Sequence, residues 1–267
     1  TGCGPRGQML SQGKDLSKKI MKYHNIPTPA FVVVPIGRKA KRPKRLKFPL
    51  IVKSVSEDAS AGISQNSVVD SDEKLEERVA FIHDRIGTAA IVEQYIDGRE
   101  IYVGVLGNER LTALPIWELK FTALAAGALP IATEHVKHNV EYQKKRGVID
   151  GLADDLTPTL TNKIRDMVKR CCRVLEIDGY ARIDLRLDAK GTPYFIEANP
   201  NPEIASSEEL AQSAAHDGIA YPDLLNRILQ LGLQRAGKEI VYVERPSLRP
   251  HRRAVMVASS EVAAVRE

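Results

Sequence analysis

A hairpin in the C-terminal half of the chain constrains the fold more than any other sequence feature. Its two predicted strands, residues 180–187 and 193–198, are joined by a turn that contains Gly191. Apolar residues alternate with Arg182 and Asp184 along the first strand. Because successive side chains of a strand point to opposite faces, one face of the hairpin should enter a hydrophobic core while the other carries charged groups.

The charged face of this hairpin has the composition of a metal site. Glu197 and Asn199 are two residues apart, as are Arg182 and Asp184, so each pair shares a face. A four-residue turn would set Arg182 opposite Glu197, with Asp184 on the next diagonal. Carboxylate and amide oxygens suit Mg²⁺, so Asp184, Glu197 and Asn199 are predicted metal ligands. The alternative is a surface hairpin in which Arg182 pairs with Glu197.

The rest of the chain mixes helical and strand patterns without the regular βα repeat of a doubly wound sheet. Strands are predicted at residues 31–34, 49–53, 89–95, 100–106 and 111–119, and helices at residues 14–23, 157–178 and 221–233, after Ser71 and around Ala211. Residues 121–151 show no regular period. They are too long for a simple connection between two elements, so they are a candidate active-site loop. We therefore predict an α+β fold with mostly antiparallel sheets.

The composition argues against a membrane protein and against a disulfide framework. None of the 267 residues belongs to an apolar run that approaches the roughly 20 residues needed to span a bilayer. The N-terminal residues show no apolar leader segment. Cys3, Cys171 and Cys172 fit neither disulfide nor metal-ligand spacing, and the last two fall inside a helical pattern. We expect a cytoplasmic chain with no membrane partner.

Positive charge is concentrated in one segment. The formal net charge is +5, and seven of the ten residues 38–47 are Lys or Arg. This basic block is interpreted as a solvated loop between two strands, with contact to nucleic acid as a low-rated alternative. The alternative is weakened because no aromatic residue is interleaved before Phe48, and no zinc spacing or RNP-like motif accompanies the block.

Several patterns follow one another in a fixed order. They are Lys14 thirteen residues before Pro27, the strand 49–53 followed by a small polar loop at 56–62, the segment 91–100, and the hairpin with 181–184 and 194–199. From about Thr1 to Leu233, this order resembles the ATP-grasp portion of the D-alanine–D-alanine ligases.

The resemblance implies an ATP-grasp fold, in which two α+β lobes with mostly antiparallel sheets grip ATP between them. It implies four parts of the chain. They are a flexible N-terminal lead at 1–13, a small lobe with a phosphate-covering loop at 14–97, a large lobe with the metal site at 98–235, and a peripheral tail at 236–267.

The resemblance also implies a role for each candidate site residue. Lysines and a loop serine would bind the phosphates of ATP: Lys14, Lys53, Lys137 and Ser60. The hinge would bind adenine and ribose through Glu93, Tyr95, Ile96 and Glu100, with Ile196 as an apolar surface for the purine. Asp184, Glu197 and Asn199 would hold two Mg²⁺ ions, with Mn²⁺ as the alternative, and Arg182 would stabilise an oxyanion as the catalytic residue.

The implied activity is an ATP-dependent ligase that joins a carboxylate to an amine, both small molecules such as amino acids, through an acylphosphate. A homodimer is considered as its assembly. A nucleotide-binding module that has no ligase activity and acts through a partner chain is the main alternative.

Three residues depart from the pattern of the resembled family. Asp58 brings a negative charge into the phosphate-covering loop. Glu203 replaces a glycine that follows the metal hairpin, and Glu208 stands near the position of a serine that receives a substrate carboxylate. A carboxylate is a poor partner for another carboxylate and a good one for an amine.

Overall fold

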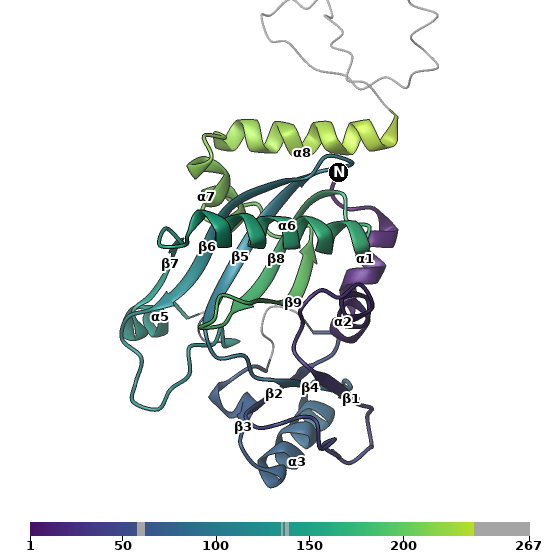
Figure 1. Cartoon of the computed structure of the whole chain (residues 1–267), viewed down its shortest axis with the longest axis vertical. Helices are drawn as coiled ribbons and strands as arrows, with labels where there is room; N and C mark the ends of the chain where they lie inside the picture. The colour runs from purple at the N-terminus through teal and green to yellow at the C-terminus, as the bar shows by residue number, and fades with distance from the viewer. Residues whose placement is uncertain (58–61, 135, 137–138, 238–267) are drawn as a thin grey trace, which may run out of the picture.

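The computed structural model describes residues 1–57, 62–134, 136 and 139–237, and they form two antiparallel β-sheets with helices around them (Figure 1). The small sheet has the order β1-β4-β2-β3, with β1 at Phe31–Val34, β4 at Ala90–Gln94, β2 at Leu50–Ser54 and β3 at Val68–Val69. The large sheet has the order β7-β6-β5-β8-β9, with β7 at Val148–Leu152, β6 at Thr112–Phe121, β5 at Arg99–Gly107, β8 at Gly179–Leu187 and β9 at Pro193–Pro200. All described strand pairs are antiparallel, so the predicted α+β class is confirmed.

The helices are short to medium in length. They are α1 (Pro5–Gln12), α2 (Lys14–Tyr23), α3 (Asp72–Phe81), α5 (Val140–Arg146), α6 (Pro158–Val174), α7 (Glu209–His216) and α8 (Tyr221–Ala236), with a 3₁₀ turn η1 (Gln65–Ser67) and a π-turn η2 (Ile82–Ile86). No helix among the described residues is long and apolar enough to cross a membrane.

The small sheet buries one face against α3. Val52 on β2 and Val92 on β4 pack with Leu75 and Val79 of that helix. The helix begins at the predicted cap, where the Ser71 hydroxyl accepts a hydrogen bond from the Lys74 amide at 3.3 Å. Because side chains alternate along a strand, the residues between these core positions on β2 and β4 face the large sheet.

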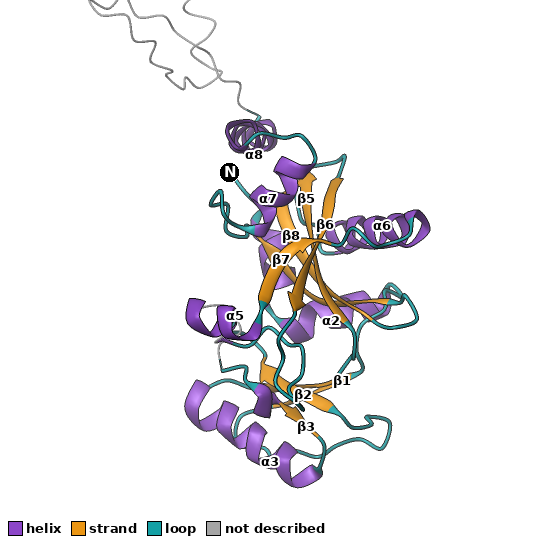
Figure 2. Ribbon diagram, turned by 90° about the vertical axis from the view of Figure 1, so that its left-hand side faces the viewer, coloured by secondary structure: helices purple, strands orange, loops and turns teal. Residues whose placement is uncertain are grey.

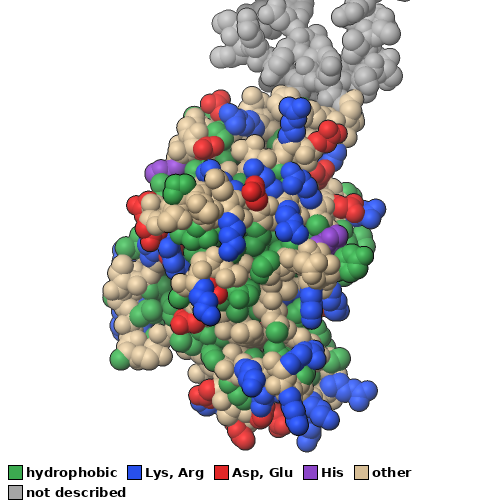
Figure 3. All heavy atoms as spheres, viewed as in Figure 1, with side chains coloured by type: hydrophobic (Ala, Val, Ile, Leu, Met, Phe, Trp, Pro, Cys, Tyr) green, Lys and Arg blue, Asp and Glu red, His purple; other side chains and the backbone are tan. Residues whose placement is uncertain are grey.

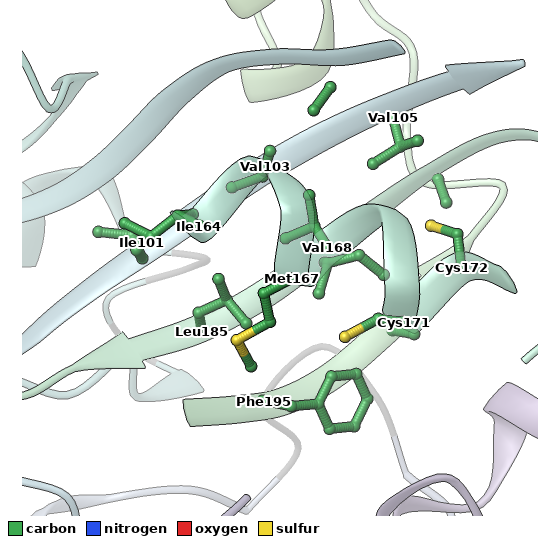
Figure 4. Packing of buried hydrophobic residues seen from close by; sticks show 14 of the residues in the cluster. Ile101, Val103, Val105, Ile164, Met167, Val168, Cys171, Cys172, Leu185 and Phe195 are labelled. Carbon is green, nitrogen blue, oxygen red and sulfur yellow. The ribbon is translucent and has the colours of Figure 1, made fainter. Parts of the chain in front are cut away.

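The large sheet buries one face against α6. This helix places Ile164, Val168 and Cys171 on one stripe, and they pack on apolar residues of β5, β8 and β9 such as Phe195 (Figure 4). Full burial of one such side chain contributes about 1.5–3 kcal/mol. Figure 2 shows α6 on one side of this sheet and α7 on the other. At one end of that other face, α7 and α8 cover Leu106 and Leu114; the opposite end remains available for the site.

Residues 1–13, expected as a flexible lead, contain a helix that packs on the large sheet. Helix α1 and the following α2 both contact β9. The Gly4 amide donates to Asp178 Oδ1 at 2.6 Å, and Cys3 is buried. Gly7 lies so close to the backbone of Glu176 that a β-carbon would come within 2.5 Å of its carbonyl oxygen. Helix α2, within the range expected for the small lobe, thus contacts the large sheet.

Two further segments differ from, or add to, the predictions. Residues 121–151, predicted as irregular, contain α5 and β7. The basic block 38–47 lies between β1 and β2, and Figure 3 shows Lys and Arg side chains gathered at that end of the molecule. Arg42 ties the block to α3 by bonding both carboxylate oxygens of Asp72, at 2.8 and 2.9 Å, and it stacks over the Phe48 ring.

Candidate active site

A cleft between the two sheets collects most of the residues that were predicted to bind ATP. We call it the inter-sheet cleft. The predicted residues that line it are Lys14, Lys53, Glu93, Tyr95, Ile96, Glu100, Asp184, Ile196 and Glu197. Arg182 and Asn199 line a second cavity, which Glu197 also lines. The two cavities therefore meet at Glu197.

The register of the metal hairpin differs from the predicted one. Asp184 lies opposite Glu197, and Arg182 lies opposite Asn199, whereas the prediction placed Arg182 opposite Glu197. Two irregularities add up to this result. The turn sets Leu187 opposite Pro193, one residue later than expected, and a bulge beyond the pair of Leu185 and Phe195 shifts the register once more.

The bulge returns Glu197 and Asn199 to the face of the sheet from which the longer turn alone would have moved them. A one-residue slip turns every side chain to the other side of a sheet, whereas a bulge inserts one extra residue. Phe195 and Ala198 both enter the core beneath α6. The bulge between them leaves Glu197 and Asn199 on the same face as Asp184. The shared face was therefore predicted correctly, although the pairing was wrong.

Arg182 is held by two carboxylates. Its guanidinium donates to both oxygens of Asp184, at 2.7 and 3.0 Å, and to Glu209 Oε2 at 3.2 Å. It also lies over the ring of Tyr102, 5.0 Å from the centroid. Burial alone would lower the pKa of Arg182, but the charge and hydrogen bonds of Asp184 outweigh it and hold that pKa well above its ordinary value.

Lys14 and Lys53 reach the inter-sheet cleft from different elements. Lys14, at the start of α2, places Nζ 3.3 Å from Glu197 Oε2 and donates to the Glu57 carbonyl at 2.7 Å. Lys53, on β2, places Nζ 3.3 Å from Glu93 Oε2. Two ammonium groups thus approach the cleft, one beside Glu197 and one beside Glu93, as a site for a polyphosphate requires.

Glu93 lies deeper than its predicted adenine-binding role suggested. Its side chain is 1% exposed and lies between Lys53 and Lys18, whose Nζ is 3.2 Å from Oε1. Burial acts to raise the pKa of Glu93, but the two lysines outweigh it, so the pKa is lowered and the group is a carboxylate. Sequence reasoning missed Lys18, although it lies one helical turn after Lys14 on α2.

The connection between β4 and β5 is organised by Arg186, another residue that the sequence reading missed. The five N–H groups of its guanidinium are used by five acceptors: the carbonyls of Ile96, Gly98 and Pro130, the Tyr95 hydroxyl and Glu100 Oε2, at 2.8–3.2 Å. Arg186 follows Arg182 and Asp184 at a spacing of two along β8, so strand alternation could have placed it on the site face.

Gly98 makes the sharp turn of this hinge. Its φ of +146° disfavours any residue with a side chain, and a β-carbon there would collide with the backbone of Leu187. The hinge therefore fits against the end of β8, which brings the predicted adenine-binding positions Tyr95 and Ile96 to the mouth of the cleft. Ile51 and Ile131 pack with Tyr95 as an apolar cluster beside them.

This geometry can be compared with known proteins. The family model described as D-ala D-ala ligase C-terminus matches residues 20–230 of the chain. The chain belongs to this family.

Individual proteins and solved structures are also similar to the chain. An uncharacterized protein, y4sG, of Sinorhizobium fredii is 32% identical over 235 residues, which cover 88% of this chain and 66% of that protein. A D-alanine–D-alanine ligase of Pelotomaculum thermopropionicum is 27% identical over 251 residues, which cover 89% and 73% of the two chains. The crystal structure of D-alanine–D-alanine ligase from Bacillus anthracis complexed with ATP superposes with a TM-score of 0.71 at 23% identity and covers 89% of this chain and 71% of that one. The ATP-grasp fold that the sequence resemblance implied is thereby confirmed.

Two predicted site residues of this family member lie outside the described residues. They are Ser60, in the predicted phosphate-covering loop, and Lys137. Asp58, the charged departure in the same loop, also lies outside them.

The predicted metal ligands of this family member form a donor set that suits Mg²⁺. Asp184 and Glu197 supply hard carboxylate oxygens from neighbouring strands, and Asn199 supplies an amide oxygen two residues further on. The buried Nδ2 of Asn199 has no hydrogen-bond partner among the described residues, so nothing described there fixes its amide in another role. No three His, Cys, Asp or Glu side chains in the described ranges converge as a metal site. The set fits a metal that takes its remaining ligands from phosphate and water.

The second cavity differs in character from the inter-sheet cleft. It has a volume of about 710 Å³ and contains Arg182 among acidic groups. We call it the acidic cavity, and its carboxylates are Asp150, Glu197, Glu203, Glu208 and Glu209. Partial burial, followed by the charges of Glu209 and Glu208, raises the pKa of Asp150 to about 6. Burial, followed by Glu209 and Glu203, also raises the pKa of Glu208.

Proposed function

We propose that the chain is the ATP-binding core of a ligase that joins a carboxylate to an amine. One observation carries this proposal. The inter-sheet cleft brings Lys14 and Lys53 to the same space as Asp184 and Glu197, and the acidic cavity with Arg182 adjoins it at Glu197. Nucleotide and second substrates can therefore meet beside the predicted metal ligands.

The reaction has two steps in this proposal. A carboxylate oxygen of the acid attacks the γ-phosphorus of ATP, the bond to ADP breaks, and an acylphosphate forms. The amine then attacks the acyl carbon, phosphate leaves with the bonding electrons, and the amine loses a proton as the amide forms. Lys14 and Lys53 hold the phosphates, and Arg182 stabilises the oxyanion of the second step. Magnesium held by Asp184, Glu197 and Asn199 would supply positive charge to the phosphoryl oxygens.

The acidic cavity supports a particular kind of acceptor. Its carboxylates outnumber its single described guanidinium, which already bonds Asp184 and Glu209. A substrate that brings another carboxylate there meets like charge, whereas a cationic amine neutralises it. We therefore propose an amine with a second positive charge, such as a diamine or a basic amino acid, in preference to D-alanine.

The test of the proposed function is phosphate release from ATP. The purified chain is incubated with ATP, Mg²⁺ and pairs of acids and amines, with the acid alone and the amine alone as controls. Release that requires both substrates is the expected result. With hydroxylamine in place of the amine, an acyl hydroxamate should accumulate, because hydroxylamine captures an acylphosphate.

Other outcomes separate the alternatives. Binding of ATP with Mg²⁺ but no release with any pair would favour the nucleotide-binding module. A salt-sensitive mobility shift of labelled nucleic acid, abolished when residues 38–47 are neutralised, would favour nucleic-acid binding.

A further inference from the structure

Lys18 is a buried cation at the junction of the two sheets. It lies on α2 one turn after Lys14, its side chain is 0% exposed, and it does not line the inter-sheet cleft. Burying an ammonium group is costly unless the group is paired and hydrogen-bonded. An apolar side chain would fill the same space at lower cost, so the contacts of Lys18 point to a functional role.

The first set of contacts is with the metal strand. Lys18 Nζ donates to the carbonyl of Ile196, lies 3.5 Å from the carbonyl of Phe195 and sits over the Phe195 ring at 5.5 Å. Ile196 is the residue that the bulge of β9 inserts between the pairs made by Phe195 and Glu197. Without the bulge, Glu197 would lie opposite Ile183 and point toward the α6 core. Lys18 thus binds the irregularity that turns Glu197 to the site face.

The second contact is with the small sheet. Lys18 Nζ lies 3.2 Å from Oε1 of Glu93, and Lys53 Nζ lies 3.3 Å from Oε2 of the same carboxylate. One negative charge is therefore shared by two lysines, and only Lys53 lines the cleft. If Lys18 were neutral, Glu93 would be balanced by Lys53 alone and would hold that ammonium more tightly against β4, away from a phosphate.

We propose that Lys18 is a positioning residue that sets two groups of the nucleotide site at once. It holds the β9 bulge that orients Glu197, and it balances Glu93 so that Lys53 remains available to the phosphates. Lys18 itself contacts neither nucleotide nor substrate. This inference rests on the proposed ATP and magnesium site, and not on the identity of the acid or the amine.

The test uses Lys18→Met, which is unbranched, one heavy atom shorter than lysine, and uncharged. The control is Lys22→Met, the same change one turn later on the same helix, where the side chain is exposed. Affinity for ADP with Mg²⁺ is measured by calorimetry without acid or amine, and Mg²⁺ is then titrated at fixed nucleotide. Because removal of a group that orients metal ligands typically weakens metal binding by about 10- to 100-fold, Lys18→Met should weaken both affinities on that scale. Lys22→Met should match the wild type.

A purely structural role for Lys18 predicts a different pattern. Lys18→Met would then lower the melting temperature, but the folded protein would bind nucleotide and Mg²⁺ as the wild type does, and that result overturns the inference. If Lys18→Met does not fold, the double variant Lys18→Met with Glu93→Gln removes the buried carboxylate that has lost one of its two lysines, and it should fold. That variant should still need more Mg²⁺ than Glu93→Gln alone, because the β9 bulge has lost its donor; equal Mg²⁺ requirements would also overturn the inference.

The proposed function fails in a distinguishable way. If the wild type and Lys22→Met bind neither ATP nor ADP in the presence of Mg²⁺, the nucleotide site itself is refuted. If they bind and Lys18→Met binds equally well, only the positioning role is refuted.

Discussion

The inter-sheet cleft and the acidic cavity share Glu197 but are built from different chemistry. The cleft combines two lysines, Arg186 and a hinge with apolar neighbours with the carboxylates of Glu57, Glu93, Glu100, Asp184 and Glu197. The cavity combines one arginine with carboxylates from β7, the segment after β9, and α7. The cleft collects most of the residues that the resemblance to the D-alanine–D-alanine ligases assigns to ATP, whereas Glu203 and Glu208 in the cavity are the positions at which the sequence is predicted to depart from that family. Under the proposed function, the difference implies that the nucleotide side and the acceptor side of one site can be altered separately, and four substitutions can test how separate they are.

The largest effect is expected at the residue that the two regions share. Glu197→Gln should leave the fold intact and lower magnesium-dependent turnover by at least about a hundredfold, because even residues that merely orient metal ligands contribute up to that much. Steady-state phosphate release over a range of Mg²⁺ concentrations measures the effect. Glu76→Gln, at an exposed position of α3, is the matched control. Unchanged turnover in Glu197→Gln would remove the metal assignment.

A smaller effect, confined to the cleft, is expected at the hinge. Arg186→Met leaves five acceptors without their donor, among them the carbonyls of Ile96 and Gly98. Unsatisfied buried groups cost about 1–3 kcal/mol, so the free energy of unfolding should fall by about 2 kcal/mol and nucleotide affinity should fall with it. Denaturant unfolding and calorimetry measure the two quantities, with the exposed Arg227→Met as control. An unchanged free energy of unfolding would contradict the role assigned to Arg186.

The third substitution acts on the cavity alone. Glu208→Gln removes a negative charge without touching the lysines or the hinge. The KM for a cationic amine should rise about tenfold, equivalent to about 1.4 kcal/mol, while the affinity for ATP stays unchanged. Initial rates at varied amine concentration measure this, and a neutral amine of similar size should show no such rise. Equal changes for both amines would mean that Glu208 does not select charge.

Strand alternation predicted which side chains of β8 and β9 share the site face, but it could not predict the register between the two strands. The spacing of Arg182, Asp184 and Arg186 along β8 requires nothing beyond the period of a strand. The pairing of β8 with β9 depends on a turn and a bulge, and the bulge is bound by Lys18 from a helix 178 residues away in the chain. Such a contact leaves no local signal in the hairpin itself.

Helix α1 was not predicted from the sequence, for a similar reason. Its sequence, from Pro5 to Gln12, has little apolar periodicity, and only Gly7 and Ser11 are buried. The helix forms where Gly7 allows close approach to the backbone of Glu176, and where the Gly4 amide meets Asp178. Tertiary packing, and not local pattern, determines this element.

The smallest expected effect tests the charge of the acidic cavity through pH. Asp150 has a pKa of about 6 in the folded chain, whereas Asp groups of the unfolded chain titrate near pH 4. Asp150 therefore binds a proton more readily in the folded chain. Stability contributed by this group is therefore present at low pH and is lost as pH rises from about 4 through about 6. Asp150→Asn should be more stable than the wild type at pH 7, and the two should converge toward pH 4. Because solvent still reaches the partly buried Asp150, screening should limit the difference to about 0.5 kcal/mol. Thermal melts at both pH values measure it, and a constant difference would show that neither burial nor the charges of Glu209 and Glu208 raise the pKa of Asp150.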